Sequence, residues 1–151
     1  MTDYKNICSK FQSLLLSLDQ NKIMLAIINL LGGGSVAVSA SFVFYHLLES
    51  YVDFLSNQSK LAKRYGGYMV KTVANLNEDT GLSVNKIRNA LKKLKEYGFI
   101  DTKTRGTNNH TTIKLNVESI SLIEKAYEKF KMERDKKIEA RKCEEEYCEA
   151  N

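Results

Sequence analysis

The chain has 151 residues, which suits one domain, or one domain with an appended element, that buries a core without disulfides or metal. An apolar fraction of 43% excludes wholesale disorder, and a net charge of +5 suits a polyanionic partner without identifying one. The three cysteines, Cys8, Cys143 and Cys148, lack zinc-ligand spacing, so we expect free thiols in a reducing cytosol. The N-terminus has no signal-peptide pattern, and we therefore expect a cytoplasmic protein.

Residues 23–48 contain no Asp, Glu, Lys or Arg, which raises the alternative of a membrane span. The run nevertheless holds Asn29, His46, several serines and three consecutive glycines at 32–34. Polar groups without partners are costly in lipid, and the glycines break a helix in the middle of the run. The sequence therefore predicts two buried helices joined by a glycine hinge, and no membrane association.

The first half of the chain is predicted to be helical. Apolar residues at helical spacing mark one face of a helix over residues 4–18, and a short apolar helix follows over 23–31. A third helix is expected over 35–57, capped by Ser35 and apolar nearly all round. Residues 56–67 are polar, basic and end in glycine, a composition that predicts a loop.

Two helices separated by a tight turn are predicted next. After a short strand at 68–70, Thr72 is expected to cap a helix that ends at Gly81, a residue suited to a left-handed C-terminal position. Ser83 then caps a helix that ends at Gly98. The inward face of this second helix is predicted to carry Val84, Ile87, Leu91, Leu94 and Tyr97.

A β-hairpin and a long helix complete the chain. Residues 99–103 and 111–117 alternate and are rich in β-branched side chains, with a polar tip at 104–110. A single charged helix is expected from 118 to about 147, with a narrow apolar stripe at Ile120, Ile123, Tyr127 and Phe130. This order predicts a mainly α fold with a small β-hairpin wing, a winged helix-turn-helix with extra N-terminal and C-terminal helices. We divide it into N-terminal helices (1–31, core support and dimerisation), a winged-helix domain (32–117) and a C-terminal helix (118–151, dimerisation).

The exposed face of the second helix is the strongest candidate for DNA contact. Asn85, Arg88, Asn89 and Lys92 follow one another at i, i+3, i+4 and i+7, opposite the apolar face. Asn pairs bidentately with adenine and Arg with guanine. Residues 82–105 carry seven Lys or Arg and two acids, a net charge of +5 that equals that of the whole chain. The predicted contact residues of this helix are Ser83, Asn85, Lys86, Arg88, Asn89, Lys92 and Lys93.

The hairpin and its approach supply further candidates, each of which has the alternative of being an ordinary solvated surface group. The predicted wing contacts are Lys103, Arg105, Asn108, Asn109 and His110. Weaker contacts with the DNA backbone are expected from Lys71 and Thr72. Lys60, Lys63 and Arg64 are interpreted as a solvated basic loop. No nucleotide-binding or metalloprotease motif occurs, so we expect no enzyme, cofactor or metal.

A family resemblance rests on the run YMVKTVANLNEDTGLSVNKIRNALKKLKEYGFIDTK. The matching residues are Asp79, Thr80, Gly81, Leu82, Ser83, Arg88, Ala90, Leu91, Leu94, Gly98, Phe99 and Ile100. The run resembles winged-helix proteins of phages and plasmids of Gram-positive bacteria, and is similar to the N-terminal domain of DnaD-like replication proteins and replisome organisers. The resemblance covers roughly residues 30–116 and implies binding of duplex DNA in replication initiation or its control. The chain has one helix after the wing rather than a second domain, a departure that argues against helicase loading.

We therefore expect a homodimeric, site-specific double-stranded DNA-binding protein of a plasmid or phage. Its partners would then include replication, partition or conjugation proteins. The alternatives are a partition or conjugation accessory protein, or a transcriptional regulator, that uses the same module. Further alternatives are a protein–protein interaction module without DNA binding and a membrane-associated protein.

Overall fold

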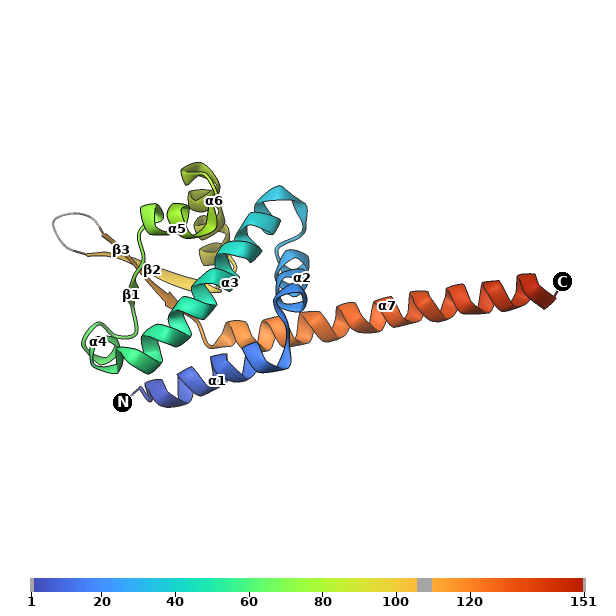
Figure 1. Cartoon of the computed structure of the whole chain (residues 1–151), viewed down its shortest axis with the longest axis horizontal. Coiled ribbons are helices and arrows are strands. Elements are labelled where there is room, and N and C mark those ends of the chain that lie inside the picture. Colours follow the sequence, from blue (N-terminus) through green and yellow to red (C-terminus); the bar gives the residue numbers. More distant parts are fainter. Residues whose placement is uncertain (1, 106–109, 151) are drawn as a thin grey trace.

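Figure 1 shows a computed structural model of the chain, which describes residues 2–105 and 110–150. The protein is mainly helical, with one small antiparallel sheet. The first four helices are α1 (Tyr4–Ser17), α2 (Gln20–Leu30), α3 (Gly34–Asn57) and α4 (Ser59–Arg64). They are followed by β1 (Met69–Val70), α5 (Val73–Thr80), α6 (Val84–Glu96), β2 (Ile100–Arg105), β3 (His110–Leu115) and α7 (Glu118–Ala150).

The other elements are organised around α3, which crosses the body of the molecule diagonally in Figure 1. The helix contacts α1 and α2 on one side and α5 and α6 on another, so it is apolar on several faces. Its buried residues are Ala37, Ala40, Ser41, Val43, Phe44, Leu47, Leu48, Tyr51, Phe54 and Leu55. They belong to one continuous core that also includes residues of α1, α2, α6, the sheet and α7.

The sheet has the strand order β1-β3-β2, with both pairings antiparallel. In this register Ile113 lies opposite Met69 on one side and Thr102 on the other, while Leu115 lies opposite Ile100. The inward face is buried, and Phe99 at the base of the β2–β3 hairpin meets Phe44 of α3 edge to face, with ring centroids 5.4 Å apart. The hairpin is therefore anchored on α3 at its base, while its other end points away from the body (Figure 1).

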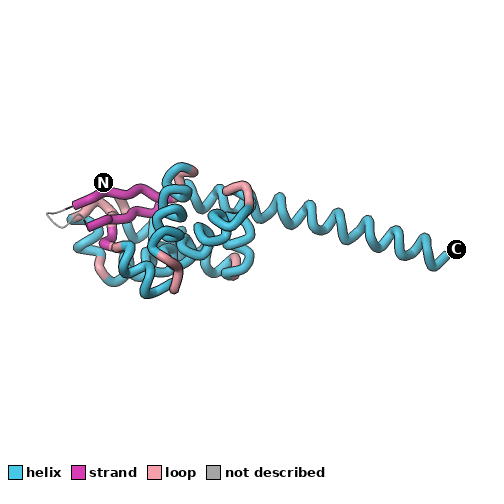
Figure 2. The backbone as a smooth tube through the Cα atoms, turned by 90° about the horizontal axis from the view of Figure 1, so that it is seen from above, coloured by secondary structure: helices cyan, strands magenta, loops and turns pink. Residues whose placement is uncertain are grey.

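The helix α7 has two unlike halves. Ser119, Ile123 and Ala126 are buried, and this first half lies against α2. Every residue from 131 to 148 is exposed. Figure 2 shows the consequence: a single helix that leaves the body and ends far from it. We call residues 131–150 the tail.

Most of the predicted elements are confirmed, with three corrections. Residues 59–64 form the helix α4 rather than a loop, because Ala62 is fully buried and α4 contacts α3 and α1. Ser35 does not cap α3: the helix begins one residue earlier, and its N-terminal flanking residue is Gly33, without a side-chain cap. Val84 and Tyr97 do not face the core but are 39% and 45% exposed, and Ala90 occupies the buried face of α6 instead.

The uncharged run at 23–48 is divided between α2 and α3, with a turn between them. Within the residues that the structure describes, no helix combines the length and the apolar character that a membrane crossing requires.

Candidate functional site

The turn between α5 and α6 fixes where α6 begins. Thr72 starts α5 with a capping box, in which its hydroxyl accepts from the Asn75 N–H and the Asn75 side chain accepts from the Thr72 N–H. Gly81 ends α5 at φ 74°, a left-handed conformation that costs a residue with a side chain about 1–2 kcal/mol. Ser83 then accepts a hydrogen bond from the Lys86 N–H, 3.3 Å away, as the N-cap of α6. These three residues confirm the capping predictions and set the start and end of α5 and the start of α6.

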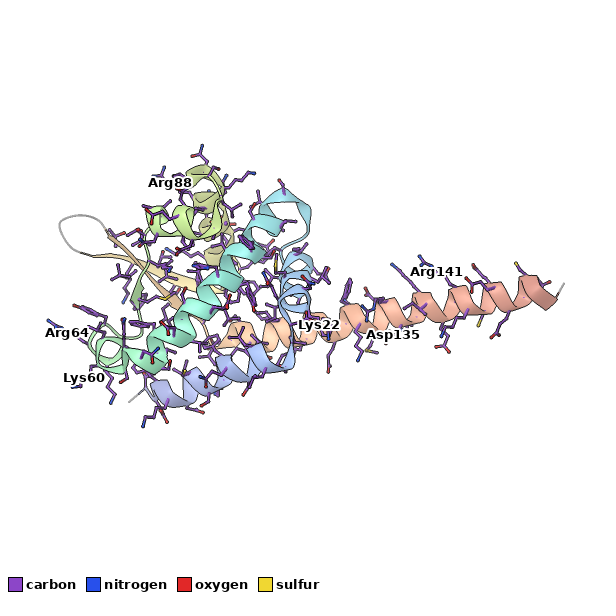
Figure 3. The ribbon with its side chains drawn as sticks, viewed as in Figure 1. Lys22, Lys60, Arg64, Arg88, Asp135 and Arg141 are labelled. Carbon is purple, nitrogen blue, oxygen red and sulfur yellow. The ribbon has the colours of Figure 1, made fainter. Side chains whose placement is uncertain are left out.

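The helix α6 presents two opposite faces. Its buried face, which packs mainly on α3, carries Ile87, Ala90, Leu91 and Leu94. The other face is polar and exposed, and it carries the predicted residues Ser83, Asn85, Lys86, Arg88, Asn89 and Lys92. Figure 3 shows Arg88 at the outer edge of the body, directed away from α3. The structure thus brings all the predicted contact residues of this helix except Lys93 together on one exposed surface.

The positive charge of this surface is not neutralised. Among the residues described, the ion pairs all involve Asp79, and none engages Lys86, Arg88 or Lys92. Lys93 is the exception to the exposed pattern: it is half-buried, and its ammonium lies 5.2 Å from the centroid of the Tyr97 ring. A surface of unpaired cations mixed with amides can attract phosphate and also donate and accept hydrogen bonds.

The hairpin adds cations to the outward face of the sheet. The Lys103 ammonium lies 4.6 Å from the centroid of the buried Tyr68 ring, and that of Lys114 lies 5.9 Å from it. This placement of Lys103 on an aromatic ring limits the freedom of a long side chain. In the strand register Arg105 of β2 lies opposite His110 of β3, where the described part of the hairpin ends. Asn108 and Asn109 lie outside the described residues.

The two weaker candidates are engaged within the protein. The hydroxyl of Thr72 caps α5, and the Lys71 ammonium lies 3.3 Å from an Asp79 carboxylate oxygen. His46 Nε2 lies 3.2 Å from the same oxygen. The hydrogen bond from Lys71, assisted by that from His46, holds the pKa of Asp79 below its usual value. This cluster ties α5 to α3 and to the residue after β1.

Sequence reasoning missed the Asp79 cluster and the role of Tyr68. His46 and Asp79 are 33 positions apart, so no local spacing connects them. Tyr68 stands beside the short strand without any pattern that would place two lysines over its ring. In the part of the chain that is described, no group of three or more His, Cys, Asp or Glu is arranged to hold a metal ion.

Comparison with known proteins returned no family model, no curated protein and no solved structure that matches the chain. The fold class therefore follows from the structure alone: the protein is mainly helical, with a small three-stranded antiparallel sheet. Its most distinctive surface is the exposed polar and basic face of α6.

Proposed function

We propose that the chain is a winged helix-turn-helix protein that binds double-stranded DNA at a specific site. In this reading α5 and α6 form the helix-turn-helix, α6 is the recognition helix, and the β2–β3 hairpin is the wing. The observation that carries the proposal is the α6 face, where Asn85, Arg88, Asn89 and Lys92 are all exposed and the cations are unpaired among the described residues.

The chemistry of this face suits the major groove. An α-helix with its side chains is about 10–12 Å across, and the groove is about 12 Å wide. Arg88 can donate two hydrogen bonds to a guanine, and Asn85 or Asn89 can pair with the N6 and N7 of an adenine. Lys86 and Lys92 can neutralise phosphates on either side. The face therefore offers both a sequence reader and a source of salt-dependent affinity.

The wing contributes to orientation more than to sequence preference. Lys103 sits on the outward face of the sheet, held over the Tyr68 ring at 4.6 Å. A preplaced ammonium loses less conformational entropy when it meets a phosphate than a freely rotating one does. Contacts of this kind set the register of a protein on the duplex.

The resemblance to phage and plasmid replication proteins supports a role in replication initiation or its control, in the cytoplasm. Partition, conjugation and transcription control remain the alternatives for the same module. DNA contact by this surface does not require a second copy of the chain. The apolar residues of α1 and α2, from which a dimer was expected, include Phe11, Leu14 and Ile23, which are buried within one chain.

The test uses a duplex selected from a randomised pool by the full-length chain, and a scrambled duplex of equal length. In the double variant Arg88→Ala, Asn89→Ala, each lost bidentate pair costs about 1–3 kcal/mol, so the affinity for the selected duplex should fall by about thirtyfold or more. The affinity for the scrambled duplex should change much less. The matched control is Asn6→Ala, Lys10→Ala, which likewise removes one amide and one cation, from an exposed face of α1.

Equal losses in the two variants, or no selectable duplex, would contradict this reading. A chain that shifts no DNA at low salt would instead favour a protein–protein interaction module.

A further inference from the structure

The face of α7 that lies against α2 changes character where the helix leaves the body. Within the body this face carries Ile123 and Ala126, with Phe130 half-buried at its end. An α-helix has 3.6 residues per turn, so the positions that follow Ile123 by 11, 14 and 18 places return to about the same side of the helix. In the tail these positions hold Arg134, Lys137 and Arg141, which we call the basic stripe.

Of the three acidic residues in 131–142, two lie well away from the stripe, and Glu133, four positions before Lys137, lies at its edge. Asp135 and Glu139 are 12 and 16 positions after Ile123, which places them about a third to half of a turn away from the stripe. Figure 3 shows the separation directly, with Arg141 on the upper side of the tail and Asp135 on the lower side. Among the described residues no ion pair engages any member of the stripe.

The basic stripe and the exposed face of α6 are turned to the same side of the molecule. In Figure 3 both Arg88 and Arg141 are directed upward, and α2 stands on that side of α7 in Figure 1. The hairpin lies toward one end of the long axis, the tail lies at the other, and α6 lies between them (Figure 1). A duplex that touches α6 and the hairpin can therefore continue over the tail.

We propose that the basic stripe binds the phosphate backbone of the DNA that flanks the site contacted by α6. This inference rests on the proposed DNA binding and extends it to a second contact surface. From Arg134 to Arg141 the helix advances by about 10 Å, and a strand of B-DNA presents a phosphate every ~3.4 Å along its axis. Three cations in one line are thus matched to about three phosphates of one strand.

The end of the tail sets the limit of this contact. Residues 131–142 hold six basic and three acidic residues, whereas residues 143–151 hold four glutamates and no cation. The glutamates repel phosphate, so the contact stops near Arg141. The acidic end of a second copy's tail is the other anionic partner that the stripe can meet, since it could lie along the stripe. The orientation of the stripe toward the side of α6 favours DNA.

The test compares three variants of the full-length chain. The stripe variant is Arg134→Gln, Lys137→Gln, Arg141→Gln. The matched control is Lys125→Gln, Lys129→Gln, Lys136→Gln, which removes three exposed cations from the opposite side of the same helix. The third variant, Glu144→Gln, Glu145→Gln, Glu146→Gln, removes the acidic end. Gln keeps the helix propensity of all three close to that of the parent chain.

Two probes separate the stripe from the recognition helix. One is the minimal duplex that the stripe variant still protects after selection from a randomised pool, and the other is the same duplex with ~20 base pairs added on each side. Dissociation constants are measured on both over a range of salt concentrations. For the long duplex, the stripe variant should bind about tenfold or more weakly, and its salt slope should fall by about 2–3, because each phosphate contact contributes about 0.9 to that slope. The control variant should change far less, and the acidic-end variant should bind more tightly.

On the minimal duplex all three variants should bind like the parent chain. Equal losses for the stripe and control variants on the long duplex would overturn the inference and leave the recognition helix untouched. The stripe would instead be assigned to a second copy if the acidic-end variant bound the long duplex more weakly than the parent chain and the parent chain formed a dimer in sedimentation velocity. Failure of the Arg88→Ala, Asn89→Ala test is a separate result, since it concerns the minimal duplex and the proposed function itself.

Discussion

The edge-to-face contact between Phe44 and Phe99 allows the attachment of the hairpin to α3 to be measured. Phe44 is fully buried, Phe99 is 1% exposed, and their ring centroids lie 5.4 Å apart. Replacing either ring by Leu removes apolar contact area and also the aromatic pairing, which is worth about 0.5–1.5 kcal/mol beyond area. In the double-mutant cycle Phe44→Leu, Phe99→Leu, each single substitution lowers the free energy of unfolding. The second substitution should therefore lower it by about 0.5–1.5 kcal/mol less when the first is already present than when it is made in the parent chain.

The free energy of unfolding of the four proteins is measured by urea denaturation monitored by far-UV circular dichroism, with a common m-value as the check for two-state unfolding. The control cycle combines Phe44→Leu with Ile123→Val, on a helix that lies mainly against α2, and should be additive. A coupling energy of zero for the aromatic pair, or equal coupling in both cycles, would refute the idea that this contact fixes the hairpin on α3.

Two further predictions concern polar contacts that hold the body together. The Tyr51 hydroxyl donates a hydrogen bond to the Gly67 carbonyl over 2.8 Å, and burial raises the pKa of this phenol, so it remains a donor. The variant Tyr51→Phe leaves that carbonyl without its donor. Its free energy of unfolding, measured by urea denaturation, should be lower by about 1–3 kcal/mol. The folded-state pKa of Asp79 lies below the ordinary value of 3.8, so the carboxylate stabilises the fold above about pH 4, and this contribution disappears as the pH falls through the folded-state pKa. Asp79→Asn should therefore lower the melting temperature at pH 7 and converge with the parent chain in acid; a constant difference across that pH range would contradict the assignment.

The elements with strong local signals were predictable from the sequence. Thr72, Gly81 and Ser83 act through their own backbone neighbours, so their types and spacing suffice to place both ends of the turn before α6. The exposed face of α6 was equally accessible, because the helical period alone separates Arg88 and Asn89 from Ile87 and Leu94. The helical period also placed Ile123 correctly in the buried stripe of α7.

The rest depended on tertiary contacts that no local pattern contains. The helix α4 is short and polar, and its burial of Ala62 against other helices stabilises a segment whose composition suggests a loop. Val84 and Tyr97 have the right spacing for the inner face of α6, but they lie at its two ends, and both are exposed. The Asp79 cluster joins residues of three separate segments, and only the folded chain brings them together.

The shared core around α3 makes the body a single unit of unfolding. Phe11 of α1, Ile27 of α2 and Ile123 of α7 belong to the same buried cluster as Leu94 and Ile113. A fragment trimmed to residues 32–117 would expose one side of α3 to water and would be prone to aggregate. The tail is different, since residues 131–148 are all exposed. Its amide protons are expected to exchange with solvent at the rate of an isolated helix, while those of α3 exchange only when the whole body opens.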